Sequence, residues 1–179
     1  MAKDMPGTTE DPSARDRDLW QLPVAQQTPH REVNTPFIMH RMTLDEVETS
    51  LRRRRPDLTP MLIERGELDY RRFLMLKVAY PTHGIVPTNL IDAWWEAHIL
   101  FTVKYAADCE DMLPPHAADR EKFFLHHDPM VMPGTVDHAN GVKHRNMLFV
   151  HHFGDFPYLL NADSERNQGE RLSDGETCA

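Results

Sequence analysis

Two histidine pairs are the residues of this sequence best suited to chemistry. FFLHHDP spans residues 123–129 and LFVHHFG spans residues 148–154, so each pair follows an aromatic and an aliphatic residue. Histidine is the commonest metal ligand, and its imidazole exchanges protons near neutral pH. Adjacent side chains of an extended segment point to opposite faces. At most one histidine of each pair is therefore expected to face a common ion.

A long helix is predicted over residues 89–112, between the N-cap residue Thr88 and a Pro-Pro pair. One face of this helix carries a stripe of both apolar and polar residues. His98 and Tyr105 lie along one border of this stripe, and Glu96 lies along the other. An unsatisfied buried polar atom costs about 1–3 kcal/mol, so facing elements are expected to carry polar partners. The residues of the stripe are Asp92, Trp95, Ile99, Thr102, Ala106 and Cys109.

A metal site is one hypothesis for these polar residues. An imidazole from each histidine pair and a helix carboxylate would form a 2-His-1-carboxylate set. Such a set suits Fe(II), or Zn(II) with a fourth ligand, and a set richer in carboxylates favours iron or manganese. From the second pair, His151 and His152 could also contribute. The candidate ligands are Asp92, Glu96, His98, His126 and His127.

A structural clamp is the alternative hypothesis. In it, His126 or His127 bonds Asp92 or Thr102 and fixes a loop-rich region against the long helix, without an ion. Cys109 is interpreted as a small buried hydrophobic residue. The sequence contains no nucleophile elbow and no glycine-rich phosphate loop, so nucleophilic and nucleotide-dependent catalysis are not indicated.

The elements that must position these residues are mainly helical. We expect a compact α-helical domain of about four helices, with a loop-rich C-terminal part that contains short extended segments at FFL and MLFV. Thr43 and Glu46 form a capping box, Thr59 is expected to be the N-cap of a short helical turn that starts at Pro60, and Gly66 is expected to end that turn. The predicted helical stretches are 44–54, 60–65, 67–80 and 89–112.

The helical domain is predicted to span residues 37–160, between two polar ends. Residues 1–36 are rich in proline and are expected to form an extended arm, and residues 161–179 form a polar tail. A tryptophan in a polar arm is costly unless it finds a surface. One small apolar cluster of the arm is therefore a candidate anchor for a partner protein: Leu19, Trp20 and Leu22.

Composition narrows the classes of partner. The chain has 179 residues and a formal net charge of −8, so general attraction to nucleic acid or anionic lipid is not expected. Only two cysteines occur, which favours a reducing compartment over a disulfide framework. No apolar export signal or membrane-spanning stretch is visible in the sequence. A cytoplasmic location without membrane or nucleic-acid partners is the resulting expectation.

A family resemblance lies in residues 69–129. The order YP, VP, D-x-x-W, H-I-L-x-T-x-x-Y-x-x-x-C and HHDP resembles the domain of the glycine-rich domain-containing protein family of bacteria and plants. The resemblance implies a mostly helical cytosolic domain and brings no established reaction. Glu96 stands where the family has a histidine, and a longer stretch replaces the glycine before the His126-His127 pair. If that family histidine binds metal, Glu96 would shift the preference from zinc towards iron or manganese.

Two functions are predicted from these features. The first is a non-catalytic subunit or adaptor of a larger protein assembly, homo- or hetero-oligomeric, because much of the chain lies in the two polar ends. The alternative is an Fe-, Mn- or Zn-dependent enzyme, hydrolytic or oxidative, with a histidine and carboxylate site.

Overall fold

The computed structural model describes residues 29–128 and 133–160. In these two stretches the chain is helical and contains no β-strand, so the prediction of a mainly α fold is confirmed. No helix of the described stretches is long and apolar enough to cross a membrane. The helices, in chain order, are the π-helical turn η2 (Phe37–Arg41), α2 (Asp45–Arg54), α3 (Pro60–Ala79), α4 (Asn89–Ile99), α5 (Thr102–Asp111), the 3-10 turn η3 (Arg120–Lys122) and α6 (Val136–Phe153).

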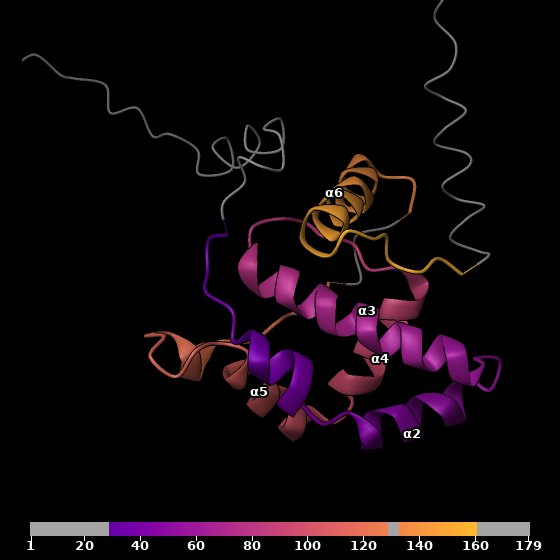
Figure 1. The fold of residues 1–179 in the computed structure, drawn as a ribbon, viewed down its shortest axis with the longest axis horizontal. Helices are drawn as coiled ribbons and strands as arrows, with labels where there is room; N and C mark the ends of the chain where they lie inside the picture. The colour runs from indigo at the N-terminus through magenta and orange to yellow at the C-terminus, as the bar shows by residue number, and fades with distance from the viewer. Residues whose placement is uncertain (1–28, 129–132, 161–179) are drawn as a thin grey trace, which may run out of the picture.

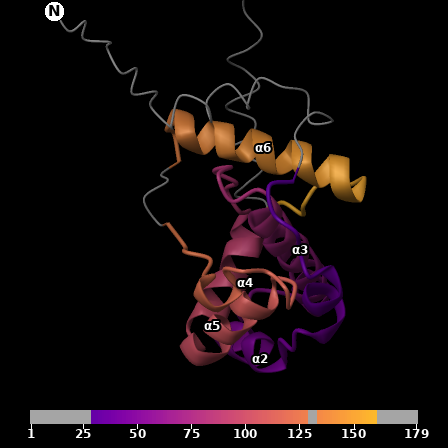
Figure 2. The same ribbon diagram turned by 90° about the vertical axis from the view of Figure 1, so that its left-hand side faces the viewer.

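The helices form a bundle with α6 across one end. α3 and α2 both pack against α4, and η2 packs against α3 (Figure 1). In the view turned by 90°, α6 is seen from the side and lies as a separate layer across the bundle (Figure 2). The largest fully buried side chains are aromatic, as expected of residues that dominate core burial. They are Trp94, Tyr70, Tyr80, Tyr105, Phe73 and Phe149.

The helix caps of the sequence analysis are confirmed at two sites and wrong at one. Thr59 accepts a hydrogen bond from Leu62 N at 3.3 Å at the start of α3. Thr88 accepts one from Ile91 N at 3.2 Å at the start of α4. The predicted capping box does not form, because Leu44 is the N-cap of α2 and no side chain caps that helix.

Helix α3 runs through Gly66, so the prediction that this glycine ends a short turn is wrong. A Cβ atom at Gly66 would lie 2.7 Å from Trp94 Nε1 and 2.9 Å from Leu90 Cγ. Real Cβ contacts are longer than this, so the missing side chain lets α4 approach α3 closely. The glycine therefore serves packing between two helices, which local sequence does not reveal.

The predicted helix over residues 89–112 is wrong in one respect, because it is broken between α4 and α5. Phe101 adopts φ −87° and ψ 63°, outside the helical region. Trp95 Nε1 donates to Tyr105 Oη at 2.7 Å, and His98 bonds Asp108 at 2.9 Å. Both pairs are ten residues apart, a separation that would span about 15 Å along a straight helix. These two buried bonds require α5 to fold back on α4.

The C-terminal part is also more helical than predicted. The run MLFV, expected to be extended, lies inside α6, which begins after the N-cap Thr135 and ends at Gly154 with φ 72°. Gly141 faces the loop before α4: a Cβ atom there would overlap the carbonyl oxygen of Gly84 and lie 2.5 Å from Val86 Cγ2. α6 thus rests on backbone of the bundle through a glycine.

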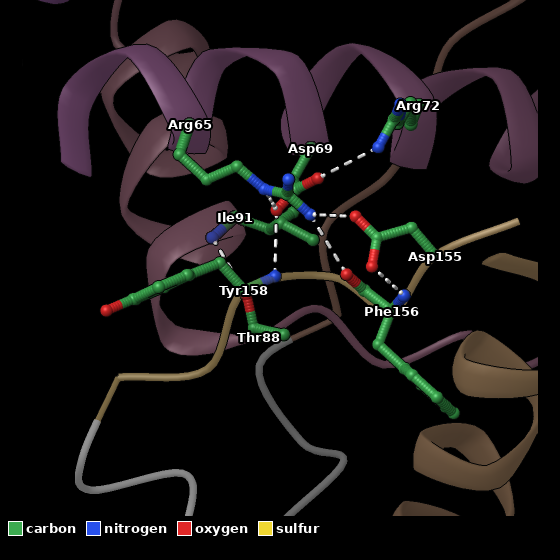
Figure 3. Close-up of polar contacts among 8 residues, drawn as sticks. All are labelled: Arg65, Asp69, Arg72, Thr88, Ile91, Asp155, Phe156 and Tyr158. Carbon is green, nitrogen blue, oxygen red and sulfur yellow. Dashed lines mark hydrogen bonds and ion pairs between the residues drawn. The ribbon is translucent and has the colours of Figure 1, made fainter. Parts of the chain in front are cut away.

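An ionic network holds the segment after α6 against α3 (Figure 3). Asp69, which is 1% exposed, accepts from Arg65 Nε at 3.0 Å and from the backbone N of Tyr158 at 2.8 Å. The same guanidinium bonds Asp155 Oδ2 at 2.8 Å and the carbonyl oxygen of Phe156 at 3.0 Å. The buried carboxylate is therefore paired, which its burial requires.

The end of the predicted arm lies on the bundle. His30 N donates to Ala79 O at 2.8 Å, and Asn34 N donates to Met112 O at 2.8 Å. The proposed anchor at Leu19, Trp20 and Leu22 lies outside the described residues.

Candidate metal centre and adjoining cavity

Three of the five candidate metal ligands come together in the structure. Asp92, Glu96 and His127 each offer a ligand atom, and these atoms lie within 4.8 Å of one another. The two carboxylates are one turn apart on α4, so they share a face of the helix. His127 Nε2 lies 2.8 Å from Asp92 Oδ1. The geometry of the predicted clamp is therefore present, with a second carboxylate beside it.

The extended segment after η3 is held in place by its backbone. Tyr105 Oη donates to Leu125 O at 2.7 Å, and Leu125 is buried. His127 follows two residues later on the same side, and its ring packs 4.7 Å from the ring of Trp95. His126 points the other way, is exposed, and packs 4.9 Å from the ring of Phe124. Only one histidine of the pair thus faces the carboxylates, as the alternation of an extended segment predicts.

His98 lies apart from this group, in a buried polar chain. Its Nδ1 is 2.9 Å from Tyr70 Oη, and its Nε2 is 2.9 Å from Asp108 Oδ2, which also accepts from Lys104 Nζ at 2.7 Å. Burial raises the pKa of Tyr70 well above its usual value, so the phenol stays protonated and donates to Nδ1. The Nε2 proton is then donated to Asp108. Both ring nitrogens of His98 are occupied.

The second histidine pair is placed on α6 and is not part of the ligand group. His152 Nε2 lies 2.8 Å from Tyr80 Oη, and the rings of His151 and His152 are 4.8 Å apart. Burial, followed by the neighbouring His151, lowers the pKa of His152. This pair therefore contributes to the contact between α6 and the end of α3.

A cavity of about 360 Å³ adjoins the ligand group, which is within the size range of small-molecule sites. Asp92 and His127 line it, together with Trp95 and the ammonium-bearing Lys77 of α3. Burial lowers the pKa of Lys77, and the charge of Asp128 opposes this shift. The remaining wall is the loop between α3 and α4, residues 81–87, with Asn89, His126, Asp128, Pro133 and His138.

Sequence reasoning missed Lys77, Tyr70 and Asp108. Lys77 stands alone in the apolar run FLMLKVAY, and a lone charge on a buried helix was a signal that could have identified it. Tyr70 and Asp108 gave no such signal, because the contact of Tyr70 with His98 depends on the packing of α3 against α4, and that of Asp108 on the break between α4 and α5.

His144, a further buried histidine, is expected to make the folded protein less stable at acid pH. His144 of α6 is 4% exposed and its ring lies 6.2 Å from that of His83. Burial, then His83 and Lys143, lower the pKa of His144 to about 4. Because the folded state prefers the neutral imidazole, its stabilising contribution is complete above the unfolded pKa of about 6.5. It is lost as the pH falls from there towards 4.

The expected loss from His144 is on the order of 1–3 kcal/mol between pH 7 and pH 4. Urea unfolding of wild-type protein and of His144→Gln at several pH values measures it. The variant should show a shallower acid limb. Parallel pH profiles for the two proteins would contradict this role of His144.

Comparison with protein-family models, with curated proteins and with solved structures gave no match. The resemblance to the glycine-rich domain-containing family therefore stays a prediction from the residues that carry it.

Proposed function

We propose that this chain binds one divalent metal ion through Asp92, Glu96 and His127 and acts as a metal-dependent enzyme on a small molecule in the adjoining cavity. The observation that carries the proposal is the approach of three ligand atoms to within 4.8 Å, two of them from residues that line the cavity, Asp92 and His127. Two carboxylates and one imidazole suit Mn(II) and Fe(II), and Zn(II) also accepts these donors.

Three protein ligands leave coordination positions for water and substrate, which is the pattern of catalytic rather than structural zinc sites. A bound ion would supply a Lewis acid and a water of lowered pKa. The chain's own residues would orient the ion and shield it. Trp95, 3% exposed, covers one side of His127 and keeps its ring in position. Asp92 and His127 belong both to the ligand group and to the cavity wall, so an ion there would be open to a substrate.

Glu96 favours a metal site over a clamp. The bond between His127 and Asp92 alone would satisfy a structural clamp. The Glu96 carboxylate makes no hydrogen bond or ion pair with any residue that the structure describes, and it lies one turn from Asp92. Like charges at this spacing repel each other modestly. A divalent cation would relieve that repulsion, whereas in a clamp the exposed Glu96 carboxylate is only a solvated surface charge.

The Glu96→Gln variant is expected to bind Mn(II), Fe(II) or Zn(II) about 10- to 100-fold more weakly than the wild type, because a charged ligand is replaced by a neutral amide. Titration calorimetry, anaerobic for Fe(II), measures the dissociation constants. Glu64→Gln, a change of the same kind at an exposed position of α3, is the matched control and should leave them unchanged. Equal metal affinities in the wild type, Glu96→Gln and Glu64→Gln would show that Glu96 is not a metal ligand.

A subunit role is the second proposal, and exposed apolar side chains at the corner between α4 and α5 favour it. Leu100 is 60% exposed and Val103 is 85% exposed. Neighbouring large apolar side chains left in water are a feature of contact surfaces. Light scattering at micromolar concentration should then give a mass above that of one chain, and Leu100→Glu with Val103→Glu should reduce it. A single-chain mass for the wild type would contradict this role in self-association.

A further inference from the structure

Lys77 is a charged side chain whose role the metal site alone does not explain. It lies two residues before the end of α3, and its ammonium makes no hydrogen bond or ion pair with residues 29–128 or 133–160. It lines the cavity described above and also the neighbouring depression formed with Lys122 and Phe124. A partly buried ammonium is costly unless an anion compensates it. Within the described chain, the carboxylate of Asp128, which lines the same cavity, offsets the charge of Lys77 without a hydrogen bond or ion pair to it.

The Trp95 indole connects Lys77 with the ligand group. Lys77 Nζ lies 5.9 Å from the centroid of the Trp95 ring, and the His127 ring packs 4.7 Å from the same indole. Both side chains also line the cavity. The ammonium and the ligand group therefore border one space, with the indole as part of its wall.

The charges of this space depend on whether an ion is present. Without an ion, the carboxylates of Asp92 and Asp128 in the cavity wall, together with the neighbouring Glu96, outweigh the ammonium of Lys77 and repel anions. A divalent ion held by Asp92 and Glu96 would neutralise these two carboxylates, so that Asp128 alone would oppose the ammonium and the ion's open coordination positions. Opposite charges attract strongly in a partly desolvated site. An anion should thus bind the metal-loaded protein and not the metal-free one.

We propose that the cavity binds a small oxyanion, a carboxylate or a phosphate group, held between the metal ion and the Lys77 ammonium. The proposal rests on the proposed function, because the ion supplies one of the two attachment points. Oxygen ligands complete the coordination of Mn(II) and Fe(II) readily. The apolar rest of the ligand would contact Trp95 and the proline-rich loop of residues 81–87. The oxyanion is accordingly the recognition group of the substrate.

Lys77→Met tests the oxyanion site in Mn(II)-loaded protein. The probes are inorganic phosphate, followed by ³¹P relaxation, and acetate, followed by ¹³C relaxation. Paramagnetic enhancement reports binding of each probe beside the ion. We expect saturable enhancement in the wild type and at least about tenfold weaker binding in the variant, since a charge-assisted contact is lost. Comparison of the two probes identifies which oxyanion fits. Lys122→Met, which removes a lysine of the neighbouring depression only, should resemble the wild type.

Mn(II) electron paramagnetic resonance on the same samples distinguishes a failure of the oxyanion site from a failure of the metal site. Methionine matches the length of lysine without its charge, so Lys77→Met is expected to fold and to bind Mn(II) as the wild type does. If wild-type protein binds Mn(II) but both probes bind equally well to wild type and Lys77→Met, the oxyanion site is wrong and the metal site stands. If wild-type protein leaves Mn(II) free, the metal site is wrong and the oxyanion site falls with it.

Discussion

The His98→Ala variant is expected to be about 3 kcal/mol less stable than the wild type and to keep full metal affinity. The substitution leaves the buried Tyr70 hydroxyl without its acceptor and removes one partner of Asp108, which retains Lys104. It also opens a cavity in the core, because His98 is 0% exposed. Urea unfolding gives the change in stability, and calorimetric titration of the folded variant gives its metal affinity.

The control for this prediction is His40→Ala. His40 is exposed and its side chain makes no hydrogen bond or ion pair with the residues that the structure describes, so its removal should change the free energy of unfolding by less than about 0.5 kcal/mol. A folded His98→Ala protein that has lost metal binding would instead identify His98 as a ligand. Unchanged stability would contradict its role in the buried polar chain.

The His127→Ala variant is expected to lose metal affinity by about 100-fold or more, because it removes the only imidazole of the ligand group. His126→Ala is its matched control. The two histidines are adjacent in sequence, yet His126 is exposed and points away from the carboxylates. Titration of Mn(II), followed by the resonance signal of the free ion, measures both variants.

The two hypotheses for the histidine pair give opposite results in this experiment. A clamp between His127 and Asp92 predicts a loss of thermal stability in His127→Ala and no metal binding in any of the three proteins. Equal metal affinity in His126→Ala and His127→Ala would exclude His127 from the ligand group.

Local signals in the sequence account for much of the fold. The N-cap residues Thr59 and Thr88 mark the starts of α3 and α4, and the mainly helical class followed from such signals. The break after Ile99 left no local sign, since neither proline nor glycine stands there. It is imposed by bonds between side chains ten residues apart, Trp95 with Tyr105 and His98 with Asp108. Tertiary contacts of this kind override the local helical preference.

The sequence also predicted part of the candidate site. Residue type and helical spacing identified Asp92 and Glu96, and the alternation of an extended segment implied that one histidine of the first pair would join them. Which histidine it would be depended on Leu125, whose burial sets the register of the segment. The position of Lys77 at the cavity depends on how α3 packs against α4, a contact that no local pattern encodes.

The metal content of protein purified without a histidine tag shows whether the chain binds a metal ion at all. After reconstitution with Mn(II), Fe(II) or Zn(II) and removal of free ion, elemental analysis should find about one equivalent per chain of at least one metal. The combined variant Asp92→Asn, Glu96→Gln and His127→Ala should retain almost none. Less than about a tenth of an equivalent of every metal in the wild-type protein would contradict the assignment of Asp92, Glu96 and His127 as a metal site.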